Sequence, residues 1–267
     1  MDRIKNKQKA FRFIGNYGTI IGLFLIILIF SILRPKAFLT TNNFLNVLNN
    51  ASLLGIIASG LTTVVIVGEF DMSIAYTASF AGVFVCGLMV KQGLSVFLAI
   101  LVTIITGILF GLFNGLMVTK LNVSSVIATI GSGSLIYGLN YAYTNGSPVL
   151  TGIPTKFHEL TLFRLFSKIP INIIYMLIIT LLLWVMLNKT EVGVRIKSTG
   201  GNLTASKLAG INTDKIKIFT YCISGACAAI TGILLASVMG SGTSSAGDAY
   251  LMNSFACVYV GAATLKD

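Results

Sequence analysis

Apolar residues along this chain gather into eight long stretches, which shorter polar segments separate. The stretches cover residues 17–33, 51–68, 74–90, 94–118, 123–142, 169–187, 216–239 and 250–265. A helix needs about 20 predominantly apolar residues to cross a bilayer. The pattern therefore predicts an all-α integral membrane protein, a polytopic bundle of about eight transmembrane or re-entrant helices. The second stretch is rich in glycine and threonine and the eighth is short, so we expect that either could be broken or re-entrant.

Composition and charge favour the same class of protein. Of the 267 residues, 55% are hydrophobic and only 10% are charged, whereas soluble domains carry about 25% charged residues. A net charge of +11 would indicate a nucleic-acid partner in a soluble protein. Here the basic residues lie mostly between the apolar stretches, where they set the topology. We therefore expect this chain to contact a lipid bilayer and no nucleic acid.

The distribution of lysine and arginine also orients the chain. If the N-terminus is cytoplasmic, the cytoplasmic segments hold 12 of these residues and the outer segments hold 6. Because basic residues accumulate on the cytoplasmic side, this orientation is favoured, and it places residues 188–215 in the cytoplasm. On the outer side, residues 34–50 are expected to form a short interfacial piece before the second stretch. Residues 143–168 are expected to form either an amphipathic lip on the membrane surface or an ordinary long loop.

Enzyme signatures are missing from the sequence. It contains no GxxxxGK[ST] motif, no complete dinucleotide fingerprint and no nucleophile elbow, and its single histidine excludes HExxH. The four cysteines lie inside apolar stretches and none has a CxxC spacing. We therefore expect no catalytic residue, no metal and no cofactor bound by this chain.

The longest polar stretch, residues 188–215, is basic and lies between two long apolar stretches. Asn202 can cap a short helix that ends at Gly210, and the apolar residues of this helix lie on one side. Such a helix either offers a surface on which another protein can push or rests on the bilayer. The residues of this candidate coupling helix are Asn202, Leu203, Ala205, Ser206, Lys207, Leu208, Gly210 and Ile211.

The segment Gly-Glu-Phe-Asp-Met-Ser at 68–73 places two acids where two apolar stretches meet. An aspartate at mid-bilayer costs about 2.5–3.5 kcal/mol, so these side chains must face water, a cavity or a partner. Asp71 and Ser73 can cap the helix that follows. They can alternatively serve a solute pathway or its gate, and both interpretations stay open.

Glycines recur every fourth residue in the fourth stretch, at Gly107, Gly111 and Gly115. They form a smooth helix face that lets another helix approach closely. This pattern favours packing inside the bundle, with contact to another subunit as the alternative. Asn114 lies beside the same face.

Polar and aromatic residues follow one another along the fifth stretch, as Ser125, Thr129, Ser132, Tyr137 and Tyr141. Hydroxyl groups can bond a hydroxylated solute, and sugar rings can stack on aromatic faces. Interhelical hydrogen bonds, with the tyrosines at the membrane interface, are the alternative. The whole series favours a solute pathway, whereas each residue alone fits the alternative as well.

Five stretches together resemble the permeases of ribose-type sugar ABC importers, the group that carries pentoses and hexoses. The stretches are residues 68–73, 111–115, 126–131, 200–211 and 250–264. Their order and spacing match from about residue 40 onward, and the cytoplasmic stretch is the most specific. The stretch at 68–73 usually reads Gly-Gly-Ile-Asp-Leu-Ser in the family, so this chain has Glu69 where the family has a glycine.

This resemblance implies a single permease domain over residues 1–267 in a bacterial cytoplasmic membrane. It implies a second permease subunit, identical or related, that completes the pathway. A tandem-domain ABC ATPase would dock on the coupling helix and bind ATP and magnesium. A sugar-binding protein outside the cell would deliver the solute, which alternating access then moves inward.

Family members have about ten helices and continue past the last matched stretch. The sequence here stops at Leu265-Lys-Asp267, before that continuation, so it resembles a member without its last helices. Two other functions stay open. One is a secondary transporter driven by protons or sodium through Glu69 and Asp71, and the other is a truncated membrane protein that does not transport.

Overall fold

The computed structural model describes residues 2–165 and 168–264. It describes side chains from Gly18 to Ala263, except those of residues 166–167. Its elements are α1 (Asp2–Leu33), α2 (Pro35–Phe38), α3 (Thr41–Ile66), α4 (Ile74–Val90), α5 (Val96–Lys120), α6 (Ser125–Thr144), α7 (Thr155–Leu162), β1 (Arg164–Leu165), β2 (Ile169–Pro170), α8 (Ile171–Lys189), α9 (Glu191–Gly201), α10 (Leu203–Leu208), α11 (Thr213–Met239) and α12 (Tyr250–Thr264). The two short strands pair antiparallel. The prediction of an all-α membrane protein is confirmed.

Every predicted apolar stretch contains a helix. Within the described residues, α3, α5, α8 and α11 are long and apolar enough to cross a membrane, and shorter apolar helices lie at 18–33, 74–90 and 250–263. The third stretch, 74–90, coincides with α4. Residue 265 of the eighth stretch lies outside the described residues.

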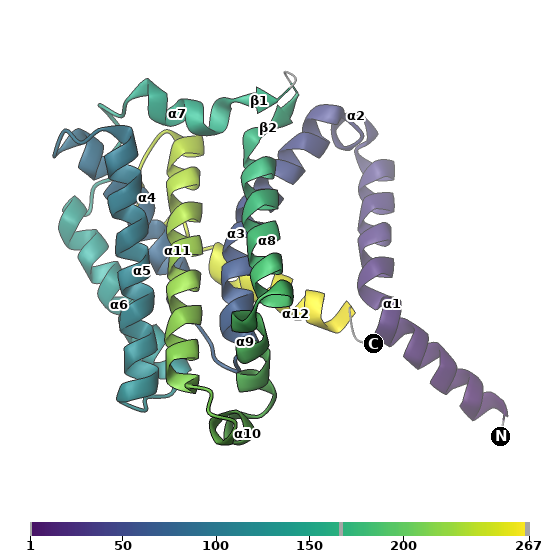
Figure 1. Ribbon diagram of the computed structural model, residues 1–267. Coiled ribbons are helices and arrows are strands. Elements are labelled where there is room, and N and C mark those ends of the chain that lie inside the picture. Colours follow the sequence, from purple (N-terminus) through teal and green to yellow (C-terminus); the bar gives the residue numbers. More distant parts are fainter. Residues whose placement is uncertain (1, 166–167, 265–267) are drawn as a thin grey trace.

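The helices α3, α4, α5, α6, α8 and α11 run roughly parallel or antiparallel to one another, and α11 lies among them (Figure 1). We call the end of the bundle that carries α7 the α7 end, and the end that carries α9 and α10 the α10 end. The N-terminus lies toward the α10 end (Figure 1). The helix α12 lies across the bundle near mid-height, at a large angle to α11, as expected for a re-entrant element (Figure 1).

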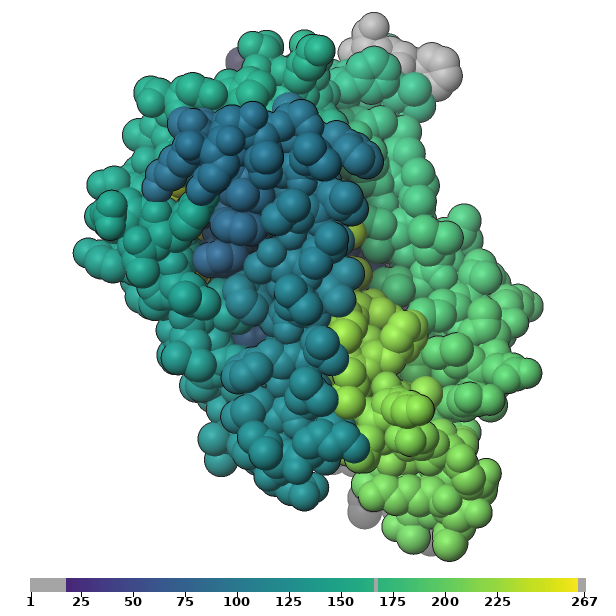
Figure 2. Space-filling view, turned by 60° about the vertical axis from the view of Figure 1, so that its left-hand side comes forward, coloured from purple at the N-terminus to yellow at the C-terminus, as the bar shows by residue number. Residues whose placement is uncertain are grey.

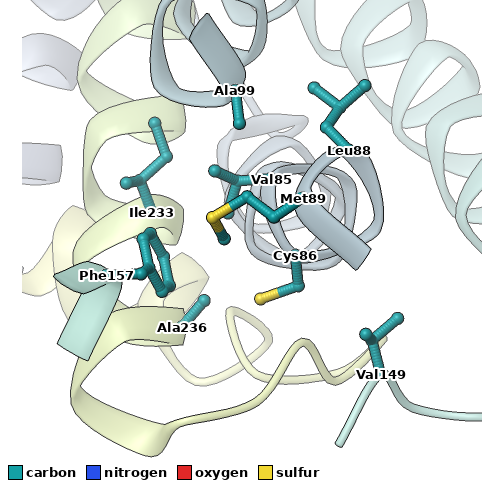
Figure 3. Packing of buried hydrophobic residues seen from close by; sticks show 9 residues of the cluster. All are labelled: Val85, Cys86, Leu88, Met89, Ala99, Val149, Phe157, Ile233 and Ala236. Atoms are coloured by element: carbon teal, nitrogen blue, oxygen red, sulfur yellow. The ribbon is translucent and has the colours of Figure 1, made fainter. Parts of the chain in front are cut away.

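Figure 2 shows α11 at the surface between the teal α5 and the green α8. At the α7 end, a core cluster of nine buried apolar residues joins α4, α5, α7 and α11 (Figure 3). Phe157 of α7 is buried in this cluster beside Ile233 and Ala236 of α11. The side chain of Ser237 donates to the carbonyl of Phe157 at 2.6 Å. The segment expected to be a lip or a loop thus contains a helix anchored on α11.

Two predicted boundaries were wrong. The second apolar stretch begins at 51, but α3 begins at Thr41 and continues unbroken to Ile66. Thr40 caps this helix, because its side chain accepts a hydrogen bond from the backbone of Asn43. The expected interfacial piece at 34–50 is therefore α2 together with the first turns of α3. Residues 188–215 hold two helices, α9 and α10, where one was predicted.

Candidate functional site

The junction between α3 and α4, residues 67–73, holds the carboxylate of Asp71 inside the bundle. Asp71 is only 1% exposed. Its Oδ1 accepts from the backbone N–H of Ser73 at 3.0 Å and from the Ser73 hydroxyl at 2.6 Å. Its Oδ2 accepts from the hydroxyl of Ser224 in α11 at 2.7 Å. Because the buried carboxylate has these three donors, its burial is compensated.

The capping interpretation holds in part. Asp71 bonds the backbone N–H at the start of α4, close to the positive end of the helix. The Ser73 hydroxyl, however, donates to Asp71 and accepts from the side-chain amide of Asn114 at 2.8 Å. The expected capping by Ser73 itself was therefore wrong. The Oδ1 atom of Asn114 is buried and has no partner among the described residues.

Side chains of α6 and α11 also hold the junction backbone. Thr129 accepts from the backbone N–H of Met72 at 3.0 Å, and Ser125 accepts from that of Phe70 at 3.3 Å. The hydroxyl of Tyr221 donates to the carbonyl of Phe70 at 2.9 Å. These two helices thus fix a non-helical segment within the bundle, as backbone away from water requires.

An ion pair joins the same junction to the first turns of α11. The ammonium group of Lys217 bonds a carboxylate oxygen of Glu69. The two side chains are only 16% and 14% exposed, so each charge depends on the other. The junction is therefore tied to α11 at three places, through Lys217, Tyr221 and Ser224.

Only some of the predicted pathway residues meet at this site. Asp71, Ser73, Asn114 and Thr129 form one hydrogen-bonded cluster with the junction backbone. Ser132 lies next to it and donates to the carbonyl of Thr129 at 3.2 Å. Tyr137 and Tyr141 lie apart from the cluster, on the exposed face of α6. The ring of Tyr137 contacts that of Tyr76 edge-on, with centroids 6.2 Å apart.

The glycine stripe of α5 packs against α11. A Cβ atom at Gly107 would lie 2.6 Å from the carbonyl oxygen of Gly225, and one at Gly115 would lie 2.8 Å from Cα of Ile218. At Gly111 it would collide with the carbonyl group of Tyr221. The stripe therefore lies against α11 inside the bundle, which leaves no room on this face for another subunit.

The candidate coupling helix exists as α10, shorter than predicted, at Leu203–Leu208. Asn202 caps it, accepting from the backbone of Ala205 at 2.9 Å. Gly210 has φ of +80°, the left-handed conformation that lets the chain leave a helix. Ser206 is buried, whereas Lys207 and Leu208 are exposed.

The apolar residues of α10 are not buried against the bundle. Leu208 is 85% exposed and Leu203 is 38% exposed, while Ile211 is half-buried. A hollow of about 370 Å³ lies between α9 and α10, lined by residues that include Ala205, Ala209 and Ile211. This end of the molecule thus offers an open surface with an exposed apolar tip.

The unpredicted helix α9 connects α10 to the junction. A Cβ atom at Gly200 would collide with the carbonyl oxygen of Ile66, the last residue of α3, and would lie 3.2 Å from Cα of Val67. The backbones of α9 and α3 are therefore in direct contact at the point where the junction begins. Thr190 caps α9 at its other end by accepting from Gly193.

Sequence reasoning missed several residues of this site. Tyr221 and Ser224 lie three apart in α11, so they face the same side of that helix. The same holds for Lys217 and Tyr221, which are four apart. This polar series in the seventh apolar stretch was the available signal. Among the side chains that the structure describes, no group of three His, Cys, Asp or Glu residues is placed to bind a metal.

Comparison with known proteins places the chain in a family. The family described as "Branched-chain amino acid transport system / permease component" matches residues 43–266. This chain is a member of that permease family. The permease is 33% identical to the ribose import permease of Bacillus subtilis over 273 residues, which cover 99% of this chain and 83% of the relative.

Other relatives have similar names. The permease is 33% identical to the ribose import permease of Haemophilus influenzae, over 98% of this chain and 82% of the relative. It is 29% identical to the autoinducer 2 import system permease of Yersinia pestis, over 95% of this chain and 72% of the relative. No solved structure matches the permease.

Proposed function

We propose that this permease is the transmembrane subunit of an ATP-driven importer that passes a sugar inward by alternating access. The solute would be a pentose, a hexose or a related furanose delivered by an external binding protein. The names of the relatives, which cover ribose and autoinducer 2 import, support this solute class. In this proposal the chain performs no chemistry, and the partner ATPase binds ATP and magnesium.

The α10 end would face the cytoplasm of a bacterium, and the N-terminus would be cytoplasmic. Lys120, Lys207 and Lys215 lie at or next to this end of the bundle, on α5, α10 and α11. This placement agrees with the enrichment of basic residues on the cytoplasmic side of membrane proteins. A second permease subunit, identical or related, would complete the pathway.

The observation that carries the proposal is the route from α10 to the bundle interior. The ATPase would bind the exposed tip of α10 and the hollow beside α9. Its movement would pass through α9 to the backbone contact between Gly200 and Ile66. From there it would reach the junction, which is fixed to α5, α6 and α11 by hydrogen bonds. A two-state rearrangement of this junction is what alternating access requires.

The test is co-purification of the permease with tandem-domain ATPases from its own genome, followed by uptake in lipid vesicles with the sugar-binding protein. Leu208→Asp and Lys207→Glu should each weaken ATPase binding, because they alter the exposed tip of α10. The matched control is Leu121→Asp. Leu121 is 64% exposed between α5 and α6, near the α10 end.

ATPase binding that is unaffected by both α10 variants would contradict the proposed contact. Sugar uptake by the permease alone, driven by an imposed proton or sodium gradient, would contradict the ATP-driven mechanism. It would instead support a secondary transporter.

The junction supplies a separate test within this proposal. Asp71→Ala should reduce uptake more than Glu69→Gly. Asp71 links the start of α4 to α11 through three hydrogen bonds, whereas Glu69 makes a single ion pair, with Lys217. Normal uptake in both variants would show that the junction does not act in transport.

A further inference from the structure

The segment between α11 and α12, residues 240–249, leaves the α7 end and runs into the bundle along α4. A Cβ atom at Gly242 would lie 2.9 Å from Cα of Val83, and one at Gly247 would lie 2.9 Å from the backbone nitrogen of Ser79. The same Cβ atom at Gly247 would lie 2.5 Å from the carbonyl oxygen of Ala75. From Val83 to Ala75 this path descends about 12 Å along the helix axis.

The segment therefore ends at mid-depth. Its last contacts, at Ala75 and Ser79, lie next to Ser73 on the side of the α7 end. Ser73 in turn bonds Asn114 of α5. Asn114 precedes the end of α5 at Lys120 by six residues, or about 9 Å. Figure 1 agrees, because α12, which follows the segment, lies near mid-height.

Asp248 lies at the deepest part of this segment and is exposed. The hydroxyl of Ser79 donates to its Oδ1 at 3.4 Å. None of the ion pairs among the described side chains includes Asp248. An exposed carboxylate at this depth cannot face lipid without a large cost. Non-helical backbone at membrane depth is likewise tolerated only where protein or water covers it.

Other groups beside Asp248 are suited to a polar solute. Tyr76 precedes Ser79 by three residues on α4, so the two share a helix face, and its ring contacts that of Tyr137 edge-on. Asn140 of α6 donates to the carbonyl of Ser244, while its own Oδ1 is buried with no partner among the described residues. Carboxylate, hydroxyl, amide and two aromatic rings therefore lie along one side of α4 and α6.

We propose that Asp248, held in place by the buried Ser79, forms with Tyr76 and Tyr137 the solute-contacting face of the pathway and binds a neutral polyhydroxylated solute. The carboxylate accepts hydrogen bonds from solute hydroxyl groups, and the tyrosine rings contact the apolar side of the solute. The negative charge disfavours anionic solutes such as sugar phosphates. This inference rests on the proposed function for the identity of the solute, but its claim that water reaches Asp248 is independent of the ATPase.

The first experiment measures water access in the permease alone, in lipid vesicles. Asp248→Cys is made in a Cys257→Ser background, because Cys257 is an exposed native thiol. A charged methanethiosulfonate reagent should label this thiol. The matched control is Leu182→Cys, an exposed apolar position on α8, which should stay unlabelled because it faces lipid. Equal lack of labelling at both positions would overturn the proposal, as would a disulfide between two copies through position 248.

The second experiment measures uptake in the complex with ATPase and loaded binding protein. Asp248→Asn should lower the initial rate about tenfold, since its neutral amide oxygen accepts a weaker hydrogen bond from the solute than the carboxylate does. Asp248→Glu retains the carboxylate and should keep most of the rate. Solute should also slow labelling of Asp248→Cys. Full uptake by Asp248→Asn, or labelling that solute does not slow, would overturn the role of Asp248 in binding. Failure of the wild-type complex to transport, with Asp248→Cys still labelled, would count against the proposed function alone.

Discussion

Replacing Gly111 by alanine should loosen the contact between α5 and α11. A Cβ atom at this position would lie 2.7 Å from the carbonyl carbon of Tyr221 and 2.9 Å from Cα of Cys222. The carbonyl oxygen of Tyr221 would lie closer still. Ordinary van der Waals contact begins at 3.4 Å, so the two backbones must separate by more than 0.7 Å, the difference between 3.4 and 2.7 Å. All three obstructing atoms belong to the main chain of a helix, so a side-chain rotation cannot relieve the collision.

The magnitude follows from two opposing effects. Overpacking costs about 1–3 kcal/mol, while alanine gains up to about 1 kcal/mol over glycine in a helix interior. The net loss of stability should be about 1–2 kcal/mol. At about 2–4 °C per kcal/mol, the Tm should fall by about 2–8 °C. Gly138→Ala in α6 is the matched control, because no described atom outside the adjacent turns of its own helix lies within 4 Å of its Cβ position. It should raise the Tm by about 1–4 °C.

Thermal unfolding in detergent can be followed with a thiol-reactive fluorophore, because Cys86 and Cys227 are buried and free in the folded state. A Cys257→Ser background removes the exposed thiol. If Gly111→Ala and Gly138→Ala shift the Tm in the same direction and by the same amount, the reasoning about the glycine stripe is refuted.

Three further perturbations test other contacts. Lys217→Met should lower the stability by about 2 kcal/mol because it leaves Glu69 unpaired and largely buried, and adding Glu69→Gln should recover most of that loss in a thermal double-mutant cycle. Strict additivity of the two changes would rule out the coupling. Asn202→Ala removes a helix cap worth about 1 kcal/mol, so it should weaken ATPase pull-down while the Tm of the bundle stays unchanged. A normal pull-down would show that the form of α10 does not matter for docking. Gly200→Leu should retain the ATPase but lose uptake, because its side chain forces α9 away from the end of α3, and unchanged uptake would exclude this route of transmission.

The helices in the spanning region could be predicted from the sequence, because long apolar stretches are a strong local signal. The start of α3 could not be. Its first turns contain Asn42, Asn43, Asn46 and Asn49, which look like a loop until their partners are known. Asn49, for example, accepts from the side chain of Asn172 in α8 at 2.9 Å. Such long-range partners decide the conformation and leave no trace in the local pattern.

The helix α9 was missed for a related reason. It contains Gly193, Gly200 and Gly201, and glycine disfavours helices by about 1 kcal/mol per residue. The structure shows that two of these glycines are needed for close contacts, Gly193 with the end of α8 and Gly200 with the end of α3. Tertiary packing therefore overrides the local propensity here.

The candidate site was predicted in part. Asp71, Ser73, Asn114 and Thr129 meet in one cluster, although they were identified separately in three apolar stretches or their junctions. Tyr137 was identified from its spacing, and only the structure places it beside Tyr76. A single polar residue in an apolar helix indicates that it has a hydrogen-bond partner. The identity of that partner depends on the helix that packs against it, which the local sequence does not specify.

The central position of α11 has a consequence for biosynthesis. This helix packs against α3, α4 and α5, yet it spans Thr213–Met239, in the last quarter of the sequence. While the ribosome is still making the earlier helices, the glycine stripe of α5 has no partner and Asp71 lacks the hydroxyl of Ser224. The early helices therefore lack their contacts with α11, and remain loosely associated in the membrane, until α11 is inserted among them. Assembly of the bundle is completed only after α11 has been inserted, and any factor that protects membrane helices during synthesis acts mainly before that point.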